Sequence, residues 1–168
     1  SSDTIKIWDM ETGNLFRTLK GHTGSVYGIK LTKDEKKLIS YSYDKTIKIW
    51  NTETGKLFRT FEGHYVIQLM NDDKQLVSHD NTTKIWDIET GKLLRTFNNY
   101  GQGIKLTKDE KKLISYSLNT IEIWDTETGK LLQSLGYFDL TETGFQLTKD
   151  EKKLISFSGD KTIKIWEV

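Results

Sequence analysis

The chain has 168 residues, of which 29% are charged and 35% hydrophobic, and its formal net charge is +1. This composition indicates a folded globular domain, and the small net charge provides no field that would select nucleic acid, an anionic membrane or an acidic substrate. The sequence contains no cysteine, which excludes disulfides and cysteine-based metal sites and favours a reducing compartment. With no signal-peptide or membrane-spanning pattern, we expect a cytoplasmic protein.

The chain opens with a series of short strands. Thr4–Trp8 alternates polar and apolar residues, which is typical of a β-strand. A turn that contains Gly13 leads to a second strand at residues 15–19, and Val26–Leu31 and Lys37–Ser42 follow as the third and fourth strands. No segment shows the 3.6-residue period of a helix. The pattern therefore predicts an all-β fold of short strands joined by polar turns.

One segment, KLTKDEKKLISYS at residues 30–42, organises the whole chain. It recurs letter for letter at residues 105–117 and nearly intact at 147–158, and a weaker copy occupies 69–78. Each copy is followed by an Ile-Trp pair, and a fifth pair precedes the first copy. The tryptophans are spaced 42, 36, 38 and 42 residues apart and are Trp8, Trp50, Trp86, Trp124 and Trp166. A unit of four antiparallel strands with this period predicts a β-propeller.

The repeated Gly-His pairs, the aspartates before the Trp strand and the Ile-Trp-Asp endings resemble the WD40 repeat over essentially the whole chain. In that family each blade has strands a to d, and the resemblance implies a buried network of a strand-b Ser, a b–c turn Asp, a d–a loop His and a strand-c Trp. Buried His and Trp side chains need such hydrogen-bond partners. The matching residues are Ser40, Asp44, His22 and Trp50; Ser78, Asp80, His64 and Trp86; Ser115 and Trp124; and Ser156, Asp160 and Trp166. The last two blades lack the His, and Asn119 stands near the third Asp position, so we expect these blades to be looser.

The strands do not begin and end on a blade boundary. We expect a single domain with strands c and d at 1–20, full blades at 21–62, 63–97 and 98–135, and strands a, b and c at 136–168. The resemblance implies that residues 15–19 complete the last blade, which leaves one c strand surplus. Because a four-blade ring needs about 90° between blades, we expect a homodimer by strand exchange at the termini, with eight or nine blades in all. The sequence fits an excerpt of a longer array equally well.

Candidate binding residues are the aromatic side chains of the variable d–a loops and b–c turns, because aromatic residues are common interface anchors. They are Tyr43, Tyr65, Tyr100, Tyr137 and Phe138. The resemblance implies a non-enzymatic scaffold that presents these loops to a protein or peptide. The alternatives are a self-assembling fragment or designed repeat protein without an evolved ligand, and a small-molecule or metal binder at the central channel.

We expect no catalytic, metal or nucleic-acid site in this chain. His79 stands beside Asp80 in a predicted turn. The group His64, His79 and Asp80 could bind a metal, but we expect a surface or network role for these residues and no metal site. The acidic pairs that recur in the a–b turns include Asp34-Glu35. We interpret them as solvated charges of the turns and not as catalytic dyads. Lysine pairs of the same turns, such as Lys36-Lys37, would form a basic ring that the acids nearly cancel, so we do not expect nucleic-acid binding. We predict no enzymatic activity and no cofactor.

Overall fold

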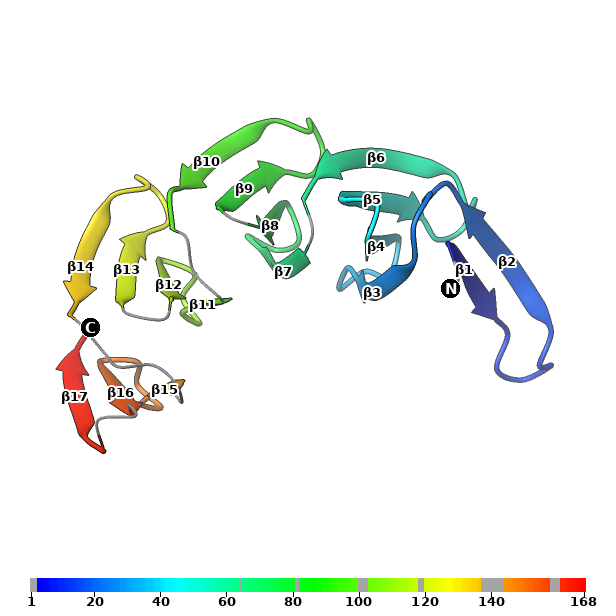
Figure 1. Cartoon of the computed structure of the whole chain (residues 1–168). Helices are drawn as coiled ribbons and strands as arrows, with labels where there is room; N and C mark the ends of the chain where they lie inside the picture. Colours follow the sequence, from blue (N-terminus) through cyan, green and yellow to red (C-terminus); the bar gives the residue numbers. More distant parts are fainter. Residues whose placement is uncertain are drawn as a thin grey trace. The chain divides into compact units, whose positions relative to one another are not determined.

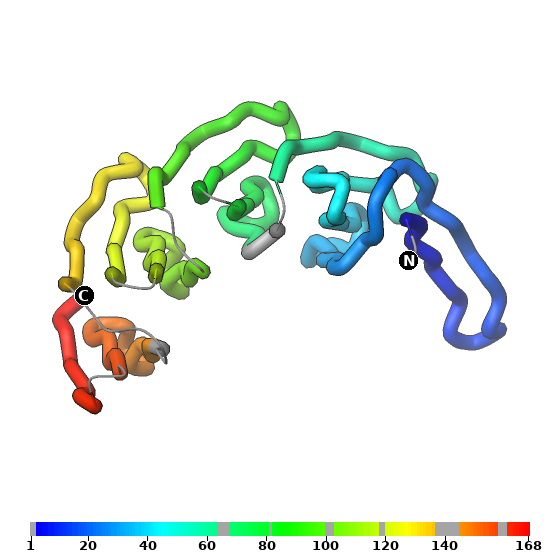
Figure 2. Tube along the Cα trace, in the orientation of Figure 1, coloured from blue at the N-terminus to red at the C-terminus, as the bar shows by residue number. Residues whose placement is uncertain are grey.

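Strands alone make up the regular structure of the residues that are described. The computed structural model describes residues 3–63, 65–80, 82–99, 103–117, 120–136, 144–157 and 161–168. These residues contain no helix, so the predicted all-β fold is confirmed, and among them no helix could cross a membrane. Figures 1 and 2 show the successive groups of strands.

Seventeen strands occupy the described residues, the number predicted from the repeat. They are β1 (Thr4–Trp8), β2 (Leu15–Lys20), β3 (Val26–Leu31), β4 (Lys37–Ser42), β5 (Thr46–Asn51), β6 (Leu57–Glu62), β7 (Tyr65–Met70), β8 (Gln75–His79), β9 (Thr83–Asp87), β10 (Leu93–Phe97), β11 (Gly103–Leu106), β12 (Lys112–Tyr116), β13 (Ile121–Asp125), β14 (Leu131–Leu135), β15 (Gly144–Leu147), β16 (Lys153–Phe157) and β17 (Ile163–Glu167).

These strands form five sheets in which neighbours in sequence are neighbours in space (Figure 1). Three sheets have the four strands a, b, c and d of a blade: β3–β6 (blade 1), β7–β10 (blade 2) and β11–β14 (blade 3). The sheet β15–β17 (blade 4) has strands a, b and c, and the sheet β1–β2 has strands c and d. In chain order, the described sheets thus contain two strands, then three groups of four, then three strands. The strand β2 pairs with β1.

The a–b turns are held by a Thr and an Asp two residues apart. The Thr32 hydroxyl donates to Asp34 Oδ1 at 2.6 Å, and the same bond recurs at Thr107–Asp109 and Thr148–Asp150. The bond from Thr32, with a second from the Lys36 backbone N–H, holds the pKa of the Asp34 carboxyl below its ordinary value. These carboxylates are thus engaged in turn formation, as their repetition predicted.

The c–d turns carry the repeated Glu-Thr-Gly sequence, which is organised by the residue at the end of strand c. Asp9 Oδ1 accepts from the Thr12 backbone N–H at 2.7 Å and from its hydroxyl at 2.8 Å. Equivalent pairs are Asn51–Thr54, Asp87–Thr90 and Asp125–Thr128. Gly13 closes the first of these turns with a φ of +69°, a conformation that costs glycine little.

The core lies between successive sheets, within two compact units at Ser1–Leu94 and Arg95–Val168. In the first unit, Ile39, Ile47 and Ile49 of blade 1 form one buried cluster with Leu69 and other residues of blade 2. In the second unit, a corresponding cluster joins isoleucines of blade 3 to Leu147 and Leu154 of blade 4. Burial of aliphatic side chains between blades is the main source of stability in such a stack.

The two-stranded sheet β1–β2 packs on blade 1 in the same way. Ile5 of β1 and Leu19 of β2 are buried against Leu38 and Trp50 of blade 1. This half-blade therefore covers blade 1 with its c and d strands alone. Trp8, the last residue of β1, remains 52% exposed, because the sheet has no strand b to supply a partner for its indole.

Candidate functional site

The loop end of blade 1 is built around four side chains from four segments. Trp50 Nε1 donates to Ser40 Oγ at 2.8 Å, Ser40 Oγ lies 2.8 Å from His22 Nε2, and His22 Nδ1 lies 2.8 Å from Asp44 Oδ2. Ser40, Trp50 and His22 are buried, and the Asp44 side chain is only 7% exposed. The four predicted residues of this blade are thus joined in one chain of hydrogen bonds.

The Asp44 carboxylate sets which atoms donate and which accept in this network of hydrogen bonds. Burial raises the pKa of its carboxyl, but the hydrogen bonds from the Thr46 hydroxyl, the Thr23 backbone N–H and His22 outweigh this effect and leave the pKa well below the ordinary value of 3.8. An ionised Asp44 accepts, so His22 Nδ1 carries the proton and Nε2 accepts from the Ser40 hydroxyl. The network therefore connects the d–a loop, strands b and c, and the b–c turn of one blade.

Ser40, His22 and Asp44 have the distances of a Ser-His-Asp triad, but they do not form a catalytic one. The Ser40 hydroxyl is fully buried and already accepts the Trp50 indole N–H. A nucleophile must be able to approach a substrate atom and must have its base free to take the proton. This arrangement instead satisfies buried polar groups, which stabilises the loop end.

The Ser–Trp pair recurs in every later blade, whereas the complete network is observed in blade 1. Trp86, Trp124 and Trp166 donate to the strand-b serines at 2.8, 3.0 and 3.0 Å. The partners are Ser78, Ser115 and Ser156, respectively. His64, Asn119 and Asp160 lie outside the described residues. Each strand-c Trp of blades 1 to 4 is therefore satisfied, including those of the blades that carry no His.

His79 is not in a turn, and the prediction that placed it there is wrong. It is the last residue of β8, pairs with Thr83 across the sheet and is buried. Its Nδ1 lies 3.0 Å from the Thr83 hydroxyl. Asp80 accepts from the Thr82 backbone N–H at 3.0 Å, which is a turn contact. Among the described residues no group of three or more His, Cys, Asp or Glu is placed to hold a metal ion.

Tyr43 is the exposed aromatic residue of this loop end. Its side chain is 71% exposed, and its ring lies 4.8 Å from that of Tyr27. Tyr27 in turn packs edge-on against Tyr41 at 5.1 Å. Because these rings support one another, Tyr43 is held next to the Asp44 turn by packing as well as by its backbone bond to Ser25. We call Tyr27, Tyr41 and Tyr43 the tyrosine cluster.

Sequence reasoning found Tyr43 but missed Tyr27 and Tyr41. A signal was present in Gly28, which pairs with Tyr41 across the sheet. A Cβ at Gly28 would lie 1.9 Å from Tyr41 Cζ, so only glycine leaves room for the ring. The other predicted aromatic positions cannot be placed in this way: Tyr100, Tyr137 and Phe138, and the side chain of Tyr65, lie outside the described residues.

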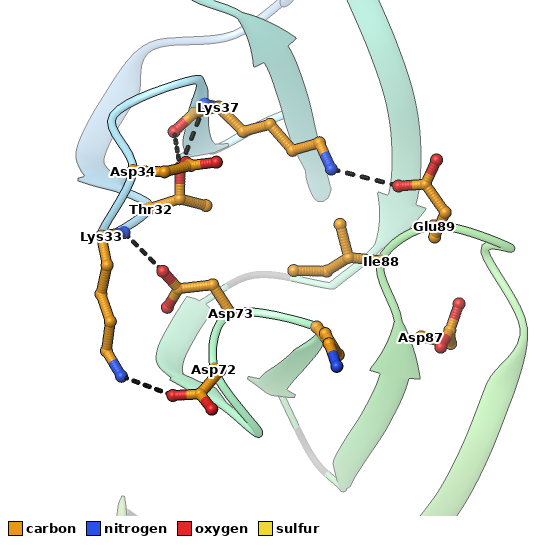
Figure 3. A pocket seen from close by; sticks show the side chains of 10 residues that line it. Thr32, Lys33, Asp34, Lys37, Asp72, Asp73, Asp87, Ile88 and Glu89 are labelled. Carbon is orange, nitrogen blue, oxygen red and sulfur yellow. Dashed lines mark hydrogen bonds and ion pairs between the residues drawn. The ribbon is translucent and has the colours of Figure 1, made fainter.

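A second feature lies among the a–b and c–d turns of blades 1 and 2. A pocket of about 520 Å³ is lined by charged residues of these turns, by Thr32 and by Ile88 (Figure 3). Lys33 pairs with Asp72 at 3.0 Å, and Lys37 pairs with Glu89 at 3.1 Å. The Lys33 backbone N–H also donates to Asp73. These pairs link the turns of two blades. Most of the charged residues around the pocket are therefore engaged in contacts between turns.

Comparison with known proteins agrees with this geometry. Residues 13–51 and 55–87 each match the family model of the WD domain, G-beta repeat. The first match spans β2 and strands β3–β5 of blade 1, which carries the complete network. The second match spans β6 of blade 1 and strands β7–β9 of blade 2.

Proposed function

Since this chain belongs to the WD40-repeat family, whose domains are in general non-catalytic scaffolds for protein interaction, we propose that it presents the loop end of its blades to a protein or peptide partner. The tyrosine cluster of blade 1 is the contact we assign to this role. The observation that carries the proposal is the exposed ring of Tyr43, packed on Tyr27 above a buried hydrogen-bond network.

The physical reason lies in the low cost of binding to a prearranged ring. An exposed side chain usually loses rotamer freedom when it is buried in an interface, and this loss opposes association. The contacts of Tyr43 with Tyr27 have already restricted its ring. Tyrosine also offers a large apolar surface together with a hydroxyl, which suits the central contacts of interfaces.

A peptide-display selection on the 168-residue chain tests this assignment. Peptides selected from a random library are labelled, and their Kd for the original chain and its variants is measured by fluorescence anisotropy. We expect Tyr43→Ala to weaken binding at least about tenfold, as for an interface anchor, and Tyr43→Phe to retain most of it. Charge reversal at Lys36, Lys111 and Lys152, in the a–b turns, is the matched control and should leave Kd unchanged.

The opposite outcome would place the binding site at the a–b turns. If the selected peptides bind the Tyr43→Ala variant as before and lose affinity with the lysine variants, then the a–b turns and not the tyrosine cluster form the binding surface. The same result would favour a partner with acidic groups, such as a nucleic acid.

We propose in addition that a second copy of the chain is a partner. Blade 4 exposes Ile163 and Ile165 of its c strand, and large exposed apolar side chains on a sheet edge favour association. The measurement is the mass of the 168-residue chain in solution by light scattering at several concentrations. We expect the mass of a dimer, and a monomer at all concentrations would contradict this part of the proposal.

A further inference from the structure

We propose that Tyr27 and Tyr43 form a site of oxidative modification, at which a one-electron oxidant joins the two rings by a carbon–carbon bond. The bond would connect strand a of blade 1, which carries Tyr27, to the b–c turn, which carries Tyr43. The proposal concerns the covalent chemistry of these rings and needs no partner, so it goes beyond the function proposed above. The distance between the rings, their access to solvent and the cysteine-free sequence support it.

The separation of the two rings meets the first requirement for such a bond. Their centroids lie 4.8 Å apart and their planes are tilted by 56°, which places carbon atoms of one ring close to van der Waals contact with the other. The Tyr43 backbone N–H also donates to the Ser25 carbonyl oxygen at 3.0 Å, and this bond holds the b–c turn beside the start of strand a. The rings can therefore join without displacement of either backbone segment.

Access to solvent selects Tyr43 as the residue that meets the oxidant first. Its side chain is 71% exposed, whereas that of Tyr27 is half-buried. The torsion that turns an aromatic ring about its Cβ–Cγ bond has a broad minimum. Tyr43 can therefore bring a ring edge toward Tyr27 while the two side chains stay in contact.

Tyr41 is the competing partner for Tyr27, and its packing disfavours the reaction. The two rings lie 5.1 Å apart at an angle of 83°, so the edge of one faces the plane of the other. The Tyr41 ring packs on the buried cluster between blades 1 and 2 and lies against Gly28, where a Cβ would be 1.9 Å from Tyr41 Cζ. Because these contacts hold the ring in place, we expect the bond to form between Tyr27 and Tyr43.

No cysteine of this chain competes for the oxidant, because the sequence contains none. Cysteine thiolates are readily oxidised, and a thiol near the site would return a hydrogen atom to a tyrosyl radical. A radical formed on the exposed phenol of Tyr43 therefore remains available for coupling to its neighbour.

The reaction removes two electrons and two protons in all. The oxidant takes one electron from the phenol of Tyr43, whose hydroxyl proton passes to water, and a second oxidation does the same at Tyr27. Each unpaired electron is shared with the ring carbons next to the phenol oxygen, and two such carbons, one from each ring, combine. The hydrogen atoms on these carbons then leave as protons while the oxygens regain protons, which restores both phenols. When a peroxidase supplies the oxidation, the electrons and protons convert one hydrogen peroxide to two waters.

The product would have a mechanical consequence for blade 1. The new bond closes a loop between strand a and the b–c turn, and a covalent link of this kind limits the conformations of the unfolded chain, as a disulfide does. The His22–Asp44 contact already brings this turn against the d–a loop, so the link fits the folded arrangement. We expect the urea midpoint of the linked protein to be higher than that of the untreated protein.

Treatment of the 168-residue chain with a peroxidase and hydrogen peroxide tests the proposal. The protein is oxidised at low concentration, and the monomer is separated from linked species on a denaturing gel. We expect this monomer to show the blue fluorescence of linked tyrosines and to have lost two hydrogen atoms by mass spectrometry. Mapping of its proteolytic peptides should place the link between Tyr27 and Tyr43.

Substitutions by phenylalanine identify the rings that react, because they keep the aromatic packing and remove the phenol. Tyr27→Phe and Tyr43→Phe should each abolish the internal link. Tyr41→Phe and Tyr116→Phe are the matched controls and should give it in unchanged yield. The Tyr116 ring packs against Phe145 at 5.4 Å, so it has an aromatic neighbour that forms no phenoxyl radical. Circular dichroism checks that each variant is folded.

Three results would overturn the proposal. They are an internal link that maps to Tyr41, an internal link whose yield is unchanged in Tyr43→Phe, and oxidation that gives links between molecules alone. The same treatment in concentrated urea should give little internal link, because the unfolded chain does not hold the two rings together. An equal yield in urea would show that the folded geometry does not create the site.

Discussion

The imidazole Nδ1 of His22 lies 2.8 Å from Asp44 Oδ2, although the two residues come from different turns of blade 1. This contact joins the d–a loop to the b–c turn, and the Thr23 backbone N–H reinforces it with a bond of 2.9 Å to the same oxygen. The tyrosine at position 43 precedes this aspartate directly. The buried network therefore sets the position of the residue that we assign to partner binding.

Replacing Asp44 should destabilise the fold. Asp44→Ala leaves the His22 Nδ1–H and the Thr23 and Thr46 N–H groups without their acceptor, which should lower the free energy of unfolding by about 1–3 kcal/mol. Urea-induced unfolding of both proteins, followed by tryptophan fluorescence, measures the difference. The change Asn119→Ala in blade 3, where no His is available, is the matched control and should cost less. Equal losses at both positions would contradict the role assigned to Asp44.

The same carboxylate should make stability depend on acid pH. The pKa of Asp44 is lowered in the folded protein relative to its ordinary value of 3.8. Its contribution is therefore fully present above that value, and it is lost as the pH falls toward the folded pKa. We expect the free energy of unfolding to fall below about pH 4 and to fall less steeply in Asp44→Asn. The measurement is urea unfolding at a series of pH values, and parallel curves for the two proteins would exclude Asp44 as a source.

The glycine opposite Tyr41 should tolerate no side chain. Gly28→Ala places a Cβ within 1.9 Å of Tyr41 Cζ, so the ring must move from its position on the core. Overpacking of this kind typically costs about 1–3 kcal/mol. Gly136→Ala is a suitable control, because a Cβ there would meet nothing within 4 Å. Thermal unfolding compares the variants. A Gly28→Ala protein as stable as the control would mean that the Tyr41 ring has free space elsewhere.

Much of the fold follows from local sequence, and the departures have physical reasons. The strand number was predictable because each strand is bounded by turns with a fixed chemistry, such as Thr32 with Asp34. His79 was misplaced because blade 2 lacks two residues between Ser78 and Asp80, so that the strand continues directly into the turn. Alignment with blade 1 places His79 where Tyr41 stands, inside a strand.

The tyrosine cluster was only partly predictable for a different reason. Tyr27 and Tyr41 lie within strands. The alternation of side chains along a strand predicts the sheet face on which each ring lies, but it does not predict which rings are in contact. The register between β3 and β4 shifts between Val26 and Gly28, which is an irregularity at Tyr27. Such a bulge changes the direction of one side chain. The two-residue alternation of a strand does not reveal this change. The contact between Tyr27 and Tyr43 therefore required the three-dimensional structure.

Truncation of the N-terminus should separate the roles of β1 and β2 in self-association. The strand exchange expected from the sequence pairs β17 with β2, so that β1 is displaced. A chain that lacks residues 1–10 should therefore dimerise at least as tightly as the original, because no intramolecular strand competes for β2. A chain that lacks residues 1–20 has no β2, so β17 finds no strand to pair with, and we expect a monomer. Sedimentation velocity over a range of concentrations measures both. If the shorter deletion abolishes the dimer as completely as the longer one, then β1 itself forms the contact and the exchanged pairing is wrong.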